Sequence, residues 1–183
     1  RLAAKLAEVE ARPAARTGQA VPAFLRAVFR GEAPAPPAPP QAEDVPAAGG
    51  SMSFWTSYDT EAAWDHLFVE ARTPGGDDWT TLPEANGHTT TSTGQSCPAG
   101  WVTLHPQLAH YQTWNGVDAC TGTGTTGAWN AASGNSAGWQ EWSIDLSAYA
   151  GQSVEISIAY ASDWASQGIG VFLDDITLPD GTS

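Results

Sequence analysis

Residues 54–72 read FWTSYDTEAAWDHLFVEAR and predict two β-strands joined by an acidic turn. The first strand begins at Phe54, and in residues 67–72 every second side chain is apolar, as in a strand with one buried face. Three carboxylates lie in or beside the turn: Asp59, Glu61 and Asp65. Because a turn brings its two strands side by side, we expect these carboxylates to present a cluster of oxygens to one cation.

The chain divides into three segments of different composition. Residues 1–32 are Ala-rich with short runs of helical spacing, and residues 33–50 form a Pro/Ala-rich linker that has no means of building a core. From residue 51 onward the pattern is that of β-strands separated by turns, which predicts an all-β antiparallel sandwich in residues 51–183. Alternating or apolar runs predict the closing strands: 139–146, 153–161 and 170–178.

A long insertion with few strand signals occupies residues 84–137. It contains the only two cysteines, Cys97 and Cys120, whose number and spacing do not fit a zinc site of the ribbon kind. A disulfide between them would close a 24-residue loop, contribute about 3 kcal/mol and indicate an oxidising, extracellular destination; a nucleophilic Cys is the alternative. We expect an ordered insertion with a small core drawn from Trp101, Leu104, Leu108, Tyr111, Trp114 and Trp129.

The formal charge of −13 argues against nucleic acid as a partner and favours divalent cations. Six of the seven basic residues precede position 31, so residues 51–183 carry one base, Arg72, against 15 acids, a net charge of −14. Nucleic acid requires a basic surface, whereas converging carboxylates attract divalent cations. No apolar run approaches the ~18 residues that a membrane-spanning helix needs, so we expect no membrane span.

Calcium is the cation that suits the acidic turn. It takes about six to eight oxygen ligands in irregular geometry, whereas zinc prefers His or Cys, and only His66 is interleaved here. Asp174 and Asp175 are further candidate ligands, although adjacent strand residues face opposite ways and only one can point inward. Two alternatives are that the acids are solvated turn residues, or that two of them are a glycoside-hydrolysing pair.

The histidines and tryptophans are the candidates for two other kinds of site, a zinc site and a carbohydrate-binding site. His105 and His110 do not have the spacing of a zinc-binding H-E-x-x-H helix, and neither a G-x-S-x-G motif nor a phosphate loop occurs in the chain. All four histidines are expected to have structural hydrogen-bonding roles. Exposed tryptophans could instead stack on sugar rings, although core packing is their commoner use. The candidates are Trp101, Trp114 and Trp129.

A series of motifs, in order, resembles one accessory domain. The motifs are SFWTSYDTEAAWDHLFVEAR, GGDDWTTLPEANGHT, SCPAGW, LHPQLAHYQT, GAWNAASGNSAGWQEWSIDLSAYAG and VEISIAYASDWASQGIGVFLDD. That domain is the β-sandwich that follows the catalytic domain in secreted immune inhibitor A type metallopeptidases, and it also occurs in some actinobacterial zinc carboxypeptidases. It is related in shape to MAM domains and to carbohydrate-binding jelly rolls. The resemblance covers roughly residues 51–180.

The resemblance implies a secreted jelly-roll domain that is not itself a peptidase and that accompanies the catalytic metallopeptidase domain of the same parent protein. It implies a structural Ca²⁺ and a disulfide between Cys97 and Cys120. The implied ligands are Asp59, Glu61, Asp65 and either Asp174 or Asp175. Alternatives are a carbohydrate-binding module and a MAM-like adhesion domain, whose partner would be a cell-surface glycan or protein.

The chain departs from this family at one place. Such domains have another apolar strand before the S-F-W strand, where this chain has its Pro-rich linker. We therefore expect a sheet that lacks one edge strand, and an uncovered edge invites pairing with another chain.

Overall fold

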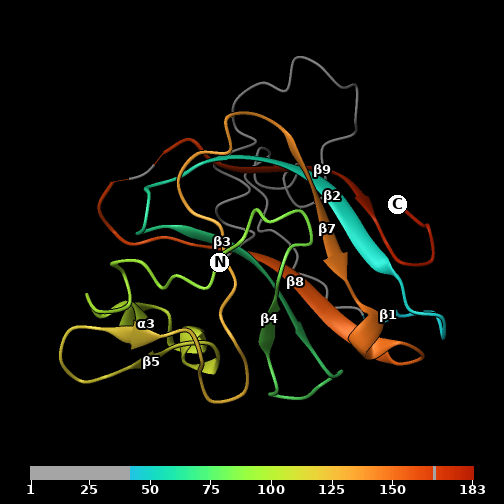
Figure 1. Ribbon diagram of the computed structural model, residues 1–183, viewed down its shortest axis with the longest axis horizontal. Coiled ribbons are helices and arrows are strands. Elements are labelled where there is room, and N and C mark those ends of the chain that lie inside the picture. The colour runs from blue at the N-terminus through green and yellow to red at the C-terminus, as the bar shows by residue number, and fades with distance from the viewer. Residues whose placement is uncertain (1–41, 167) are drawn as a thin grey trace, which may run out of the picture. The chain divides into compact units, whose positions relative to one another are not determined.

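The computed structural model describes residues 42–166 and 168–183, so the helical segment expected in residues 1–32 lies outside the described residues. The described chain is mostly β-strand (Figure 1). Its elements are β1 (Ala42–Asp44), β2 (Ser51–Asp59), β3 (His66–Arg72), β4 (Thr80–Leu82), α3 (Trp101–Leu104), the 3-10 helix η1 (Pro106–His110), β5 (Thr113–Trp114), β6 (Cys120–Thr121), β7 (Gln140–Asp145), the 3-10 helix η2 (Ser147–Tyr149), β8 (Ser153–Ala161) and β9 (Gly170–Thr177).

Two antiparallel sheets contain most of the strand residues of the described chain. Sheet A has the strand order β1-β8-β3-β4, sheet B has the order β7-β2-β9, and β5 and β6 form a separate two-stranded ladder. Every strand pair is antiparallel. The prediction of an all-β antiparallel fold with sandwich-like sheets is confirmed, while its jelly-roll connectivity stays a prediction.

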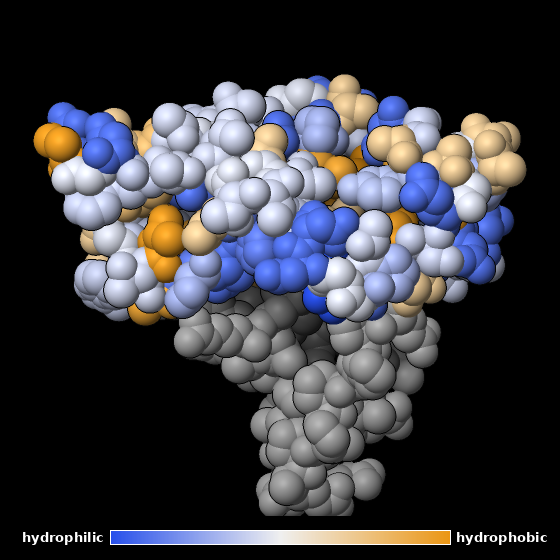
Figure 2. Space-filling model, turned by 90° about the horizontal axis from the view of Figure 1, so that it is seen from below, coloured by the Kyte–Doolittle hydropathy of each residue, from blue (hydrophilic) through white to orange (hydrophobic). Residues whose placement is uncertain are grey.

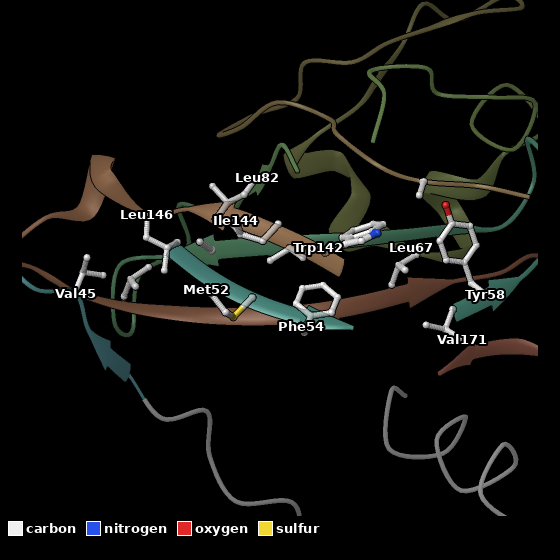
Figure 3. Packing of buried hydrophobic residues seen from close by; sticks show 14 residues of the cluster. Val45, Met52, Phe54, Tyr58, Leu67, Leu82, Trp142, Ile144, Leu146 and Val171 are labelled. Atoms are coloured by element: carbon white, nitrogen blue, oxygen red, sulfur yellow. The ribbon is translucent and has the colours of Figure 1, made fainter. Parts of the chain in front are cut away.

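The main core lies between the two sheets because their strands alternate in burial. In β2, Met52, Phe54 and Tyr58 are buried, whereas the residues between them are more exposed, Thr56 apart. Figure 3 shows Met52 and Phe54 of β2 beside Trp142 of β7 and near Leu67 of β3. The ring centroids of Phe54 and Trp142 are 5.6 Å apart. Side chains from both sheets therefore share one hydrophobic cluster.

A second core covers the other face of β3. Phe68 points away from the main core, and the insertion packs on it. The buried members of this second core are Phe68, Trp101, Leu108, Tyr111, Trp129, Ala131 and Ala161. Four residues expected in the core of the insertion are buried there: Trp101, Leu108, Tyr111 and Trp129. Leu104, also expected, is partly buried against them, whereas Trp114 is exposed. The predicted disulfide Cys97–Cys120 is also present.

Sheet A has an edge strand that was not expected. Strand β1 pairs with β8, with Ala42 opposite Glu155, and Val45 is 3% exposed in the main core. The paired structure thus begins inside the stretch predicted as linker, and the expectation of a missing edge strand is wrong. The physical reason is that residues 41–45 contain no Pro, so this short run can donate its N–H groups to the free edge of β8.

No helix within residues 42–166 and 168–183 has the length and apolar character needed to cross a membrane. The surface of the described residues is mostly hydrophilic in the view of Figure 2, with small and separate apolar spots.

Candidate functional site

The turn between β2 and β3, residues 60–65, is held against a neighbouring loop by hydrogen bonds. The backbone N–H of Thr60 donates to the carbonyl oxygen of Gly134 at 2.8 Å, and the N–H of Gly134 donates to Thr60 Oγ1 at 3.0 Å. The N–H of Ala63 donates to Ser133 Oγ at 2.8 Å, although Ala63 has a positive φ of 65°. This anchoring positions the acidic side chains of the turn.

Asp65 is the best-organised acid of the turn. Its side chain is fully buried, and its Oδ2 accepts a 2.5 Å hydrogen bond from the hydroxyl of Tyr160 on β8. The backbone N–H groups of Asp163 and Glu61 also donate to the carboxylate, at 3.2 and 3.4 Å. A carboxylate that accepts several hydrogen bonds can stay buried in its ionised form. Asp65 therefore ties the turn to the loop between β8 and β9.

Glu61 and Asp163 complete a carboxylate cluster, which we define as Glu61, Asp65 and Asp163. Burial and the charges of Asp163 and Asp65 raise the pKa of Glu61. Burial, the hydrogen bond to Asp65 and the charges of all three carboxylates raise the pKa of Tyr160, so its hydroxyl stays a donor. Glu61 Oε2 is inaccessible and has no hydrogen-bond partner among the described residues. That oxygen therefore has no donor, although the Glu61 side chain as a whole is only half-buried.

No Lys or Arg side chain compensates this cluster within the described part of the chain. Arg72 is the only Lys or Arg after residue 30. Its Nε lies 2.5 Å from Glu155 Oε2, and its guanidinium carbon lies 4.6 Å from the centre of the Trp79 ring. The one Arg of the described residues lies at the far end of β3 and is engaged there.

The structure brings together only part of the predicted ligand set. Glu61 and Asp65 meet, but Asp174 lies opposite Trp55, whereas Asp59 lies opposite Gly170 at the other end of the β2–β9 ladder. Four residues of strand span about 13 Å. Asp175 is exposed, with a positive φ of 51° at an irregularity of β9. The register thus places neither Asp174 nor Asp175 at the acidic turn.

Asp163 was not anticipated as a candidate. It follows the strand β8 in the loop before β9, and nothing in its local pattern distinguishes it from other loop acids. Only the pairing of β8 with β3, in which Ala161 lies opposite His66, brings this loop to the acidic turn. Over residues 42–166 and 168–183, no group of three or more His, Cys, Asp or Glu side chains is arranged to hold a metal ion.

A pocket of about 220 Å³, lined by small and uncharged residues together with two histidines, lies beside the turn at Ala63. No charged Asp, Glu, Lys or Arg side chain lines it. Its lining residues are Ala63, His66, His88, Thr90, Ser92, Gly94, Ala131, Ala132 and Ser133. The pocket is therefore suited to an uncharged group rather than an ion.

His66 forms the buried wall of this pocket. Its ring lies edge-on to Trp101 and Trp129, with centroid distances of 5.4 Å to each. Its Nε2 is 3.4 Å from the hydroxyl of Ser96. Burial lowers the pKa of His66 to about 4, against the weaker opposing effect of a hydrogen bond to the backbone of Ala63. A neutral, enclosed imidazole of this kind has a structural role, as predicted.

Two other histidines also make the predicted structural contacts. His105 Nε2 lies 2.8 Å from the carbonyl oxygen of Ser162, and His110 Nδ1 lies 2.9 Å from Thr126 Oγ1. The ring of His88 stacks at 6.4 Å on Trp142.

The tryptophans proposed to bind a ligand differ in exposure. Trp101 and Trp129 are 2% and 0% exposed, because both fill the second core, and neither can offer a ring face to a sugar. Trp114 is 52% exposed. The exposed tryptophans that sequence inspection did not single out are Trp55, Trp139 and Trp164. Trp55 is exposed because of its place on β2, whereas Trp139 and Trp164 lie outside the strands.

A scan against models of known protein families, a search of curated proteins and a search of solved structures each found no match for this chain.

Proposed function

We propose that the described domain is a non-catalytic, Ca²⁺-stabilised accessory domain of a secreted metallopeptidase, and that it stabilises, orients or targets the catalytic domain. The motif resemblance motivates the family. The antiparallel sheets and the disulfide Cys97–Cys120 are consistent with it, and a disulfide of this kind persists in oxidising compartments.

The observation that carries the calcium part of the proposal is the uncompensated carboxylate cluster. Glu61 Oε2 is buried without a partner beside Asp65 and Asp163, and the lone Arg of the region pairs with Glu155. An oxygen-rich, anionic setting fits calcium, which also accepts backbone carbonyl ligands and so does not need every ligand to be a side chain. Glu61, Asp65 and Asp163 are the residues proposed to hold the ion. Asp59, the last residue of β2, stays a predicted ligand beside them, whereas Asp174 and Asp175 do not fit this set, given their register.

A bound cation would supply the positive charge that the cluster lacks. Because the three carboxylates converge only in the folded chain, the cation would stabilise the folded state by mass action. It would also favour the ionised form of Glu61, whose pKa is otherwise raised. The proposed role is therefore to fasten the β2–β3 turn to the loop after β8.

The test is a thermal melt of the whole chain in millimolar calcium chloride and again in EDTA. We expect a higher Tm in calcium for the native chain, no calcium response for Glu61→Gln, and a native response for Glu141→Gln, which removes an exposed carboxylate of β7. Equal Tm values of the native chain in calcium and in EDTA would refute the calcium proposal.

The proposed partner is the catalytic metallopeptidase domain of the same parent protein. The competing MAM-like adhesion role requires self-association or a protein partner at the cell surface. Sedimentation of the purified chain over a range of concentrations separates the two, since an adhesion domain of the self-associating kind would show a dimer.

A further inference from the structure

Trp55 occupies the middle of the outer face of sheet B. Strand β2 is the central strand of this sheet, and its inward side chains include Phe54 and Tyr58 of the main core. Alternation along the strand turns Trp55 to the opposite side, where it is 40% exposed. A large aromatic ring on the solvent face of a central strand contributes little to the core between the sheets.

Two carboxylates flank this ring. The register places Trp55 directly opposite Glu141 on β7 and opposite Asp174 on β9. Directly opposed residues share a face of the sheet, with Cβ atoms about 5 Å apart. The Glu141 side chain is exposed and accepts no hydrogen bond within the described residues, and Asp174 Oδ1 accepts one from the N–H of Asp175 at 2.9 Å. Acceptor oxygens therefore stand on both sides of the ring.

The same face continues along the strands. Trp139, 52% exposed, precedes Glu141 by two residues, and alternate residues of an extended segment point to the same side. Phe172 lies opposite Ser57, two residues beyond Trp55 on β2. We define the Trp55 face as Trp55, Trp139, Glu141, Phe172 and Asp174. It combines aromatic surface with carboxylate acceptors in one row of neighbouring strands.

Charge selects among the molecules that would cover such a face. The Trp55 face contains two acids and no base, and Arg72, the only Arg or Lys after residue 30, pairs with Glu155 in the other sheet. Anionic polymers are therefore repelled, and the β-domain of a second copy, whose residues 51–183 carry a net charge of −14, is opposed by like charge. An uncharged ligand that offers apolar C–H surface and many hydroxyl donors satisfies both the rings and the carboxylates.

A pyranose chain has that chemistry, because its ring faces are C–H surfaces and its edges carry hydroxyl groups. We propose that the Trp55 face binds a neutral polysaccharide, with Trp55 as the stacking platform and Glu141 and Asp174 as acceptors for sugar hydroxyls. The inference extends the proposed accessory function by naming its ligand class. It does not involve the carboxylate cluster at the β2–β3 turn.

The test is affinity electrophoresis of the whole chain in native gels that contain hydroxyethylcellulose, mixed-linkage β-glucan or galactomannan, with heparin as the anionic control. We expect at least one neutral polymer to retard the chain and heparin to leave its mobility unchanged. Trp55→Ala should weaken the retarding interaction by about tenfold or more, as for a central aromatic anchor. Trp55→Phe should weaken it less, because a smaller ring remains.

Trp114→Ala is the matched control, since Trp114 is also exposed but lies in β5, outside sheet B. It should bind as the native chain does. Circular dichroism checks that each variant is folded. The proposal is overturned by native mobility in all three neutral gels, by equal weakening in Trp55→Ala and Trp114→Ala, or by a dimer that Trp55→Ala dissociates.

Calcium separates this proposal from the preceding one. Binding in EDTA should equal binding in calcium at temperatures where the chain is folded, while the thermal melts report on the ion. If the melts show no calcium response but a neutral polymer still retards the chain, the calcium proposal fails. If calcium raises the Tm but no neutral polymer retards the chain, the polysaccharide proposal fails.

Discussion

The hydroxyl of Tyr160 donates a 2.5 Å hydrogen bond to the carboxylate of Asp65, a residue 95 positions earlier in the chain. The bond joins the end of β8 to the β2–β3 turn. It satisfies one oxygen of a fully buried acid, and it lies within the field of two further carboxylates, Glu61 and Asp163. Together with the pairing of Ala161 and His66, this contact fixes the end of β8, where the β8–β9 loop begins, against the acidic turn.

Tyr160→Phe should destabilise the fold, because it leaves Oδ2 of buried Asp65 with only the long 3.4 Å hydrogen bond from the N–H of Glu61. A hydrogen bond to a charged group contributes about 1.5–3 kcal/mol, and the free energy of unfolding in urea should fall by roughly that amount. Tyr149→Phe is the control, since no hydrogen bond of its hydroxyl occurs among the described residues. Equal losses in the two variants would show that the bond to Asp65 contributes nothing.

The four tyrosines should resist ionisation as long as the chain is folded. Burial, the largest cause in each, raises the pKa of all four: Tyr58, Tyr111, Tyr149 and Tyr160. The unfolded chain ionises its tyrosines near pH ~10, so it binds fewer protons than the folded chain above that pH. Stability contributed by these groups is therefore present below pH ~10 and lost as the pH rises beyond it.

Ultraviolet absorbance of phenolate, followed together with circular dichroism, measures this effect. Phenolate should appear in step with loss of β structure. A full set of four phenolates in a chain that retains its native circular dichroism would contradict the prediction.

His66 should make the protein less stable as the pH falls from 6.5 to about 4. Its pKa is lowered to about 4 from 6.5 by burial, so the unfolded chain binds a proton in this window and the folded chain does not. A difference of about 2.5 units corresponds to roughly 3 kcal/mol once the pH is below the folded pKa. The raised pKa of Glu61 has the opposite effect on stability. Above pH 4.5 the folded chain holds a proton on Glu61 that the unfolded chain has lost, so this contribution decreases as the pH rises.

The contribution of His66 is isolated by comparing urea unfolding of the native chain and His66→Gln at several pH values. The difference in free energy of unfolding between them should shrink toward acidic pH. Imidazole NMR signals provide the direct check, and a His66 ring that titrates near its ordinary pKa would refute the prediction.

The edge strand β1 should contribute to stability and to solubility. A chain that begins at Gln41 retains the pairing of β1 with β8 and the burial of Val45, whereas one that begins at Ser51 loses both and exposes the edge of β8. Burying a Val side chain alone contributes roughly 1.5–3 kcal/mol. We expect a lower Tm and concentration-dependent association for the shorter chain, measured by calorimetry and light scattering. Identical behaviour of the two chains would assign β1 no role.

Removal of the disulfide should destabilise the chain by about 3 kcal/mol, since the bond restricts a loop of this length in the unfolded state. The double variant Cys97→Ser with Cys120→Ser tests this by urea unfolding, with the reduced native chain as its match. The double variant and the reduced native chain should lose the same free energy of unfolding. No loss in either would show that the second core alone holds the insertion in place.

Much of the fold could be predicted from local pattern. Alternation in β3, β7 and β8 identified these strands, and the two cysteines indicated the disulfide. The edge strand β1 was missed because a Pro-rich composition dominates its surroundings, although residues 41–45, which include it, are free of Pro. A three-residue strand has no periodicity to detect, and only the unpaired edge of β8 explains it.

The site was predictable only in part, because spacing along one segment says little about segments that meet across the fold. The sequence alone determined that the domain is acidic, antiparallel and crosslinked, and that Glu61 and Asp65 lie near each other across a turn. Tertiary structure decided that Asp163 joins them, that Asp174 instead flanks Trp55, and which tryptophans remain exposed. The physical reason is register: pairing between distant strands sets which residues are neighbours and which side of a sheet each side chain faces.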